Sequence, residues 1–224
     1  MIIERLKSVN STNEYVKKYI KGRKNAIVTA DMQTGGMGTK GRSFISKEGG
    51  LYLTQLKFYS GLYAKDAFTV MQSIAVAVCK TLMAFNVNAK IKWPNDIIVN
   101  GKKICGILIN NSFSGELIDY TVAGIGLNVN NKIDDEIADI AISMEQVLGK
   151  RVDLNSVFLT LITNLSFSAT SEEYKSLSLV LGKTITVVQG EKIYEAKAVD
   201  ISSNGELVLE SGARLSSAEV KIKI

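Results

Sequence analysis

Histidine is absent from this chain of 224 residues, which also has only two cysteines and one proline. The lack of histidine excludes Ser-His and Cys-His nucleophile pairs and histidine-based metal sites. Cys79 lies inside an apolar run and Cys105 lies between apolar neighbours, which favours two buried thiols over a disulfide or a nucleophile. Any chemistry must therefore use Lys, Arg, Asp, Asn and backbone groups.

Long apolar runs are also lacking. We find no stretch that approaches the ~18 apolar residues of a membrane span, and charges interrupt the first residues where a signal peptide would be apolar. We therefore expect a cytoplasmic protein with no membrane partner. Hydrophobic residues (46%) and charged residues (22%) are typical of a folded globular chain. The net charge of +5 suits phosphate-bearing ligands but is too small to indicate a nucleic acid partner.

The apolar pattern of the first three quarters of the chain predicts helices and strands together. Ser11 followed by Glu14 is a capping-box pattern and predicts a helix start, and apolar spacing predicts a long core helix from Tyr63 to Phe85. A further helix is expected over about 155–174. Strands are expected at residues 26–30, 51–58, 89–93, 96–99, 104–109 and 117–123, with an Asn-Gly hairpin turn at 100–101.

The pattern changes from Gly182 onward to short alternating strands separated by glycine-bearing turns. This spacing suggests a small barrel-like β domain. We place the boundary near Leu177, so the first domain covers residues 1–176 and the second covers residues 177–224. The expected fold class is α+β, with a mixed sheet backed by helices and followed by the small β domain.

A glycine-rich loop before the second strand is a candidate site. Its residues 36–41 match G-x-G-x-x-G, but no helix follows, and the next strand lacks the acidic end that would hold a ribose. Residues 36–43 approach the P-loop pattern, yet Arg42 replaces its lysine. Two interpretations stay open: a mobile surface loop, or backbone N–H groups that fold over an anion with help from Lys40 and Arg42.

Five segments together resemble biotin–protein ligases, in this order and at family-like spacing. They are Ser11-Thr12-Asn13, Gln33 to Phe44, Lys92-Trp93-Pro94-Asn95-Asp96, Lys103 to Leu108, and Gly124 to Val129. The pair K-W-P-N-D and K-x-x-G-I-L is specific, whereas the glycine loop alone is weak. The resemblance covers the whole chain and implies that the C-terminal β domain is SH3-like.

The resemblance implies an enzyme that uses ATP and Mg²⁺ to form biotinyl-5′-AMP and then passes biotin to a lysine of a biotin carboxyl carrier protein or domain. It implies biotin contacts at Ser11, Thr12, Asn13, Gln33, Gly36, Met37, Gly38, Thr39, Lys103, Gly106 and Gly124. It implies nucleotide contacts at Lys40, Gly41, Arg42, Phe44, Lys92, Trp93, Asn95 and Asn128. The expected catalytic residues are Lys103, Asp96 and Arg42, and the expected Mg²⁺ ligands are Asp96 and Asn128.

The chemistry agrees with this set of residues. A carboxylate that attacks an α-phosphate brings two anions together, so fixed cations must offset the charge of the transition state. Lys103, Arg42 and a magnesium ion would supply that charge. Asp96 is the candidate acceptor or orienting group for the proton of the incoming lysine. No residue is expected to act as a nucleophile.

The chain departs from the family in its glycine loop. Many relatives read G-R-G-R-R-G-R-x-W, whereas Met37, Thr39 and Phe44 stand here at two arginine positions and the tryptophan position. We expect this less cationic loop to hold the adenylate less firmly. The few residues before Ser11 leave no room for the winged-helix domain of bifunctional relatives, so we expect no specific DNA partner. A homodimer stays open, as do two rival functions: a lipoate or octanoate ligase or transferase, and a non-enzymatic ligand-binding relative.

Overall fold

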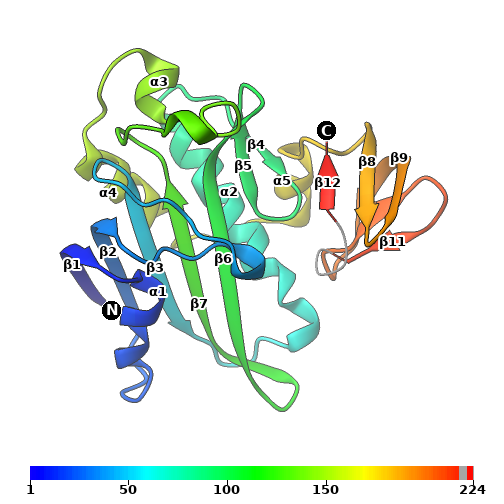
Figure 1. Ribbon diagram of the computed structural model, residues 1–224. Coiled ribbons are helices and arrows are strands. Elements are labelled where there is room, and N and C mark those ends of the chain that lie inside the picture. The colour runs from blue at the N-terminus through cyan, green and yellow to red at the C-terminus, as the bar shows by residue number, and fades with distance from the viewer. Residues whose placement is uncertain (217–220, 224) are drawn as a thin grey trace.

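The computed structural model describes residues 1–216 and 221–223, with the backbone alone described for Lys40 and for residues 221–223. Its main part is a seven-stranded sheet in the order β1-β2-β3-β7-β6-β5-β4 (Figure 1). The strands are β1 (Ile2–Val9), β2 (Ala26–Gln33), β3 (Leu51–Phe58), β4 (Lys90–Lys92), β5 (Asp96–Val99), β6 (Lys102–Ser114) and β7 (Leu117–Leu127). The first two are parallel and the other neighbours are antiparallel, so the sheet is mixed.

Helices lie on both faces of this sheet. They are α1 (Thr12–Tyr15), α2 (Phe68–Ala84), α3 (Met144–Leu148), α4 (Leu154–Asn164) and α5 (Ser171–Ser176), with short 3-10 helices η1 (Val16–Tyr19), η2 (Thr39–Gly41), η3 (Ala64–Asp66) and η4 (Asp135–Ile137). Figure 1 shows α2 and α4 behind the sheet, with α1 and the loop between β2 and β3 in front. The front face is therefore the one on which a ligand can be covered by a loop.

Two hydrophobic clusters lie on opposite faces of the sheet. The larger one joins α2, through residues such as Ile74 and Leu82, to strand residues such as Leu53 and Ile125. The smaller one packs Val16 of η1 and neighbouring side chains onto β2, β3 and β7. Because strand side chains alternate between the faces, this arrangement fixes which residues of β3 and β7 face the front.

One expectation about the apolar runs is wrong. The segment Ala64–Ala84 is 21 residues long with a mean hydropathy of 1.5, so it could cross a membrane by length and composition. Within the fold, 56% of its most apolar window is buried, and the α2 part is the long core helix that the apolar spacing predicts. The buried apolar residues of α2 belong to the larger hydrophobic cluster.

The C-terminal part is a five-stranded antiparallel sheet in the order β11-β10-β9-β8-β12. Its strands are β8 (Thr184–Gln189), β9 (Lys192–Ile201), β10 (Leu207–Leu209), β11 (Arg214–Leu215) and β12 (Lys221–Lys223). Apolar residues of this sheet, Ile185 and Leu207 among them, belong to the same cluster as α2. The predicted α+β class, a mixed sheet with helices and then a small β part, is confirmed, and the boundary at Leu177 stays a prediction.

Several local predictions can be compared with the structure. The hairpin turn is confirmed, since Asn100 and Gly101 have positive φ angles of 51° and 76°. Both cysteines are free and buried, as expected. The predicted capping box at Ser11 is wrong, because the Ser11 side chain makes no capping hydrogen bond. The helix α1 ends after one turn and η1 follows it. The helix over 155–174 is two helices, because Thr170 caps a new one.

Trp93 joins the two parts of the chain. Its ring is buried in the larger cluster, and its Nε1–H donates to the carbonyl oxygen of Gly205 at 2.9 Å. A Cβ on Gly205 would lie 2.2 Å from the Phe68 ring, and this glycine has a φ of +83°. Only glycine therefore brings that carbonyl close to Trp93 without strain.

We predict that Trp93→Phe lowers the free energy of unfolding by about 1–3 kcal/mol, because an aromatic ring remains but the Gly205 carbonyl loses its donor. Urea unfolding followed by circular dichroism measures the change. As a control, Phe113→Leu at the exposed β6–β7 tip should change the value by less than about 0.5 kcal/mol. Equal stability of Trp93→Phe and the wild type would contradict a role for this hydrogen bond.

Glu4 anchors α1 and η1 to the edge strand β1. It accepts a hydrogen bond from the Tyr15 hydroxyl at 2.6 Å and another from the Tyr19 hydroxyl, and Lys18 Nζ lies 3.0 Å from its Oε2. These contacts, the Tyr15 hydrogen bond first, lower the pKa of Glu4 from its ordinary 4.5 to about 2. The folded protein therefore favours the charged carboxylate.

A lowered pKa makes the Glu4 contribution dependent on pH. It is fully present above about pH 4.5 and is lost as the pH falls toward 2, because the unfolded chain takes up the proton first. We predict that Glu4→Gln lowers the melting temperature at pH 6–7 and that the gap to the wild type narrows between pH 4.5 and 2. Melting curves across this range test the prediction, and a gap that stays constant would refute the charge effect.

Candidate functional site

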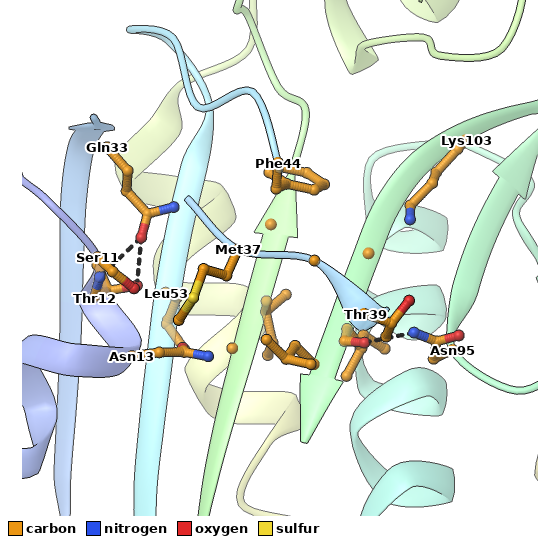
Figure 2. Close-up of a pocket in the computed structure, with 17 residues that line it drawn as sticks. Ser11, Thr12, Asn13, Gln33, Met37, Thr39, Phe44, Leu53, Asn95 and Lys103 are labelled. Atoms are coloured by element: carbon orange, nitrogen blue, oxygen red, sulfur yellow. Dashed lines mark hydrogen bonds between the residues drawn. The ribbon is translucent and has the colours of Figure 1, made fainter. Parts of the chain in front are cut away.

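A pocket lies on the front face of the sheet, between α1, the β2–β3 loop and strands β6 and β7 (Figure 2). It is lined by Ser11, Thr12, Asn13, Gln33, Met37, Gly38, Thr39, Phe44, Leu53, Asn95, Lys103, Gly106, Ile107, Leu108, Gly124, Ile125 and Gly126. The cavity volume is about 40 Å³, so the covering side chains leave little free space in the pocket.

Gln33 organises the polar end of the pocket. Its Oε1 accepts from the Thr12 amide at 2.8 Å and from the Thr12 hydroxyl at 3.0 Å. Its Nε2 donates to the Ser46 hydroxyl at 2.8 Å, and Ser46 in turn donates to the Phe44 carbonyl at 3.0 Å. Gln33 thus ties the start of α1 to the loop that covers the pocket.

Thr54 forms the floor beneath this polar end. It is fully buried on β3, and its Oγ1 lies 2.8 Å from Thr12 Oγ1 and 2.5 Å from Asn13 Oδ1. The opposite residue on β7 is Gly124, where a Cβ would lie 2.5 Å from Asn13 Oδ1. Neither Thr54 nor Ser46 was among the residues that the sequence predicts for the site.

Glycines of β6 and β7 let two more side chains lie directly on the backbone. A Cβ on Gly106 would be 2.9 Å from Lys103 Nζ, and a Cβ on Gly126 would be 2.6 Å from the Phe44 ring. Figure 2 shows the Phe44 ring in the middle of the pocket, between the polar residues and Lys103. The Phe44 ring is therefore the main obstacle to a bulky ligand in this conformation.

Lys103 and Asp96 form the charged end. Lys103 Nζ lies 2.5 Å from Asp96 Oδ1 and 5.9 Å from the centre of the Phe44 ring. The Lys103 backbone is held on both sides, since its N–H donates to Ile140 and its carbonyl accepts from Ile142. A cation is thus fixed at the pocket with a carboxylate beside it.

Asn95 reaches the same end of the pocket from the segment between β4 and β5. Its Nδ2 donates to the Ile107 carbonyl at 2.7 Å, and the Ile107 N–H donates back to the Asn95 carbonyl at 3.1 Å. Tyr174 of α5 holds the preceding residue, because its hydroxyl donates to the Pro94 carbonyl at 2.7 Å. Asn95 is therefore fixed by contacts on both sides.

The covering loop folds on itself. Met37 and Ser43 form a β-bridge, and the Arg42 guanidinium donates to the Thr39 carbonyl and hydroxyl at 3.3 and 3.0 Å. Arg42 is exposed and does not line the pocket, and the side chain of Lys40 lies outside the described part of the chain. No α-helix follows the loop before β3, so the dinucleotide and P-loop geometries are both missing here.

The structure brings together most of the residues that the resemblance implies. Those that line the pocket are Ser11, Thr12, Asn13, Gln33, Met37, Gly38, Thr39, Phe44, Asn95, Lys103, Gly106 and Gly124, and Asp96 touches Lys103. Those that do not line it are Gly36, Gly41, Arg42, Lys92, Trp93 and Asn128. Gly126, which lies within the quoted motif at 124–129, also lines the pocket without having been singled out.

The side chains of Asn128 and Trp93 make hydrogen bonds outside the pocket. The Asn128 amide donates to the Ile142 carbonyl at 3.2 Å, and its Oδ1 accepts from Asn131 at 3.0 Å. Trp93 is bound to Gly205. Within the described ranges, no group of three or more His, Cys, Asp or Glu side chains is arranged to hold a metal.

Two protein-family models and several known proteins match this chain. The sequence model described as the Biotin/lipoate A/B protein ligase family matches residues 5–128, and the one described as the Biotin protein ligase C terminal domain matches residues 180–222. The bifunctional ligase/repressor BirA of Bacillus spizizenii is 31% identical over 83% of this chain, and that of Bacillus subtilis is 30% identical over 88%. This chain spans 61% and 66% of those two relatives.

A solved structure covers more of the chain. The biotin protein ligase from Aquifex aeolicus, in a structure described as a complex with biotin and ATP, superposes with a TM-score of 0.79 and 28% identity. The superposition covers 99% of this chain and 98% of that one. Because the first sequence model matches more than half of the residues and includes every pocket segment, the chain belongs to the Biotin/lipoate A/B protein ligase family.

Proposed function

We propose that the protein is a biotin–protein ligase, which activates biotin with ATP as biotinyl-5′-AMP and transfers it to a lysine of a biotin carboxyl carrier protein or domain. The observation that carries the proposal is the pocket itself, which has hydrogen-bonding groups at one end and Lys103 at the other. The Aquifex relative, described as bound to biotin and ATP, supports both ligands. A cytoplasmic location follows from the supply of ATP and of newly made carrier.

The polar end suits the ureido ring of biotin. That ring has two N–H donors and one carbonyl acceptor, and Ser11, Asn13 and Gln33 line this end of the pocket (Figure 2). A dithiolane ring or an alkyl chain would leave the Asn13 amide nitrogen without a partner, which costs binding energy. The pocket therefore favours biotin over lipoate or octanoate.

The charged end suits the first half-reaction. A carboxylate oxygen of biotin attacks the α-phosphorus of ATP, the new P–O bond forms, and pyrophosphate leaves. Lys103 would offset the repulsion between the two anions, and its backbone is already held by Ile140 and Ile142. A cation fixed before the reaction stabilises the transition state without reorganisation. Arg42 would join it only after the covering loop releases its contact to Thr39.

In the second half-reaction the ε-amine of the carrier lysine attacks the acyl carbonyl, and AMP leaves. The amine must lose a proton, and Asp96 is the carboxylate beside Lys103 that would accept it or orient the amine. Phe44, whose ring rests on Gly126, would move aside for the ligands and offer its face to the adenine base.

A magnesium ion would fit this site between Asp96 and the phosphates of ATP. Mg²⁺ in nucleotide sites is held by one or two carboxylates together with substrate phosphates, so Asp96 and the phosphates of ATP would suffice. Asn128 does not line the pocket, and its amide is hydrogen-bonded to Ile142 and Asn131. When bound, the ion would neutralise phosphate charge.

The proposal predicts biotin-dependent exchange of labelled pyrophosphate into ATP in the presence of Mg²⁺. We expect exchange with biotin and none with lipoate or octanoate, since the polar end would stay unpaired. Omission of the acid serves as the control. Equal exchange with lipoate would favour a lipoate ligase, and no exchange with any acid would favour a non-enzymatic binding protein.

We further predict that Lys103→Ala and Lys103→Gln each lower the exchange rate by roughly 100-fold or more, because neither side chain carries the charge. The side chain is 35% exposed, so the melting temperature should change little. Lys102→Ala is the matched control, since Lys102 is the adjacent lysine but bonds the Ala138 carbonyl instead. A lysine variant that unfolds, or a Lys102 variant that is equally inactive, would contradict the assignment.

A further inference from the structure

Thr54 stands out in the middle of an apolar strand. Leu53 before it and Leu56 two residues after it on β3 are buried hydrophobic residues, and Thr54 is itself fully buried. A buried hydroxyl is costly unless it is hydrogen-bonded. Among the described residues, the Thr54 hydroxyl contacts two residues of the polar end, Thr12 and Asn13. The hydroxyl is thus placed beneath the pocket although Thr54 does not line it.

Counting protons gives the direction of the hydrogen bonds from Ser46 to Thr12, and the contact geometry gives the hydrogen bond from Thr54 to Asn13. Ser46 gives its proton to the Phe44 carbonyl, so it accepts from Gln33 Nε2 and leaves Gln33 Oε1 as the acceptor for Thr12. With its own proton given to Gln33, Thr12 can only accept from Thr54. Thr54 therefore faces two acceptor oxygens with one proton, and the shorter contact is to Asn13 Oδ1.

This contact decides which end of the Asn13 amide faces the ligand. Oδ1 is turned to Thr54, and Figure 2 shows Nδ2 turned toward the interior of the pocket. In the part of the chain that the structure describes, no group accepts a hydrogen bond from Nδ2. The amide nitrogen is a donor only, so a ligand that binds beside it is favoured when it places an acceptor atom there.

We propose that Thr54 is a positioning residue that fixes the Asn13 amide with its N–H group toward the pocket and thereby selects ligands with a carbonyl oxygen at the head-group end. The inference rests on the proposed function, in which that oxygen belongs to the ureido ring of biotin. Without the Thr54 hydroxyl, the amide is free to turn and present Oδ1 instead, so the preference for an acceptor is lost.

The test compares biotin with 2-iminobiotin, in which a protonated imino group replaces the ureido oxygen and offers donors only. Calorimetric titration at pH 7.5 gives the affinity of the wild-type protein for each ligand alone. The affinity ratio is the affinity for biotin divided by the affinity for 2-iminobiotin, and we expect it to exceed one in the wild type. Thr54→Val, which has the same shape without the hydroxyl, should lower this ratio by about tenfold or more. Thr54→Ser should keep the ratio.

A second threonine serves as the matched control. Thr121 of β7 is also buried, and its hydroxyl donates to Asn111 Oδ1 at 2.6 Å, away from the pocket. Thr121→Val should leave the ratio unchanged. A loss of general stability would weaken both ligands alike, whereas a turned amide changes their ratio, so the ratio separates positioning from folding.

Each outcome has one meaning. A folded Thr54→Val protein with an unchanged ratio, or a Thr54→Ser protein that loses it, overturns the inference and leaves the proposed function intact. A wild-type protein that binds neither ligand overturns the proposed function instead. If Thr54→Val does not fold, Asn13→Asp replaces it: the carboxylate presents an acceptor, so the preference should shift toward 2-iminobiotin, and a retained preference for biotin overturns the inference.

Discussion

Close approach of side chains to the backbone of β6 and β7 is the constraint on which the site depends. Asn13, Phe44 and Lys103 lie where Cβ atoms would stand at Gly124, Gly126 and Gly106. Glycine weakens a strand interior, but here it alternates with large apolar residues. In β7, Ile125 and Leu127 belong to the core behind the sheet while the glycines line the pocket in front. One strand thus stabilises the fold and opens the site.

The covering loop is fixed at its two ends and closed in between. The Gly35 N–H donates to the Asn10 carbonyl, and Ser46 receives the Gln33 amide, so both roots of the loop are held. Between them, Phe44 fills the space that a ligand would take. Ligand entry therefore requires the Phe44 ring to move aside, and the network at Gln33 would stay in place during that motion.

The sequence predicted the core helix and six strands of the larger sheet because these depend on local periodicity, but β1 (Ile2–Val9) was not among the predicted strands. It also identified most of the pocket residues, through motifs of a known family. It missed Thr54 and Ser46, since one polar residue in a strand or loop gives no pattern, and their roles depend on the pairing of β3 with β7 and on the position of α1. The positions of the Trp93 and Asn128 side chains depend on tertiary contacts. Trp93 bonds Gly205, which is far away in the sequence, and Asn128 bonds Asn131, a contact that no sequence pattern indicates.

The contact between Trp93 and Gly205 gives the C-terminal sheet a place in the site as well as in the fold. Trp93 is held by that sheet, and the next residue, Pro94, is held by the Tyr174 hydroxyl. The two residues after these are Asn95, which lines the pocket, and Asp96, which pairs with Lys103. The C-terminal part thus helps to hold the segment that carries the charged end, whereas the polar end is held by Gln33 and Thr54.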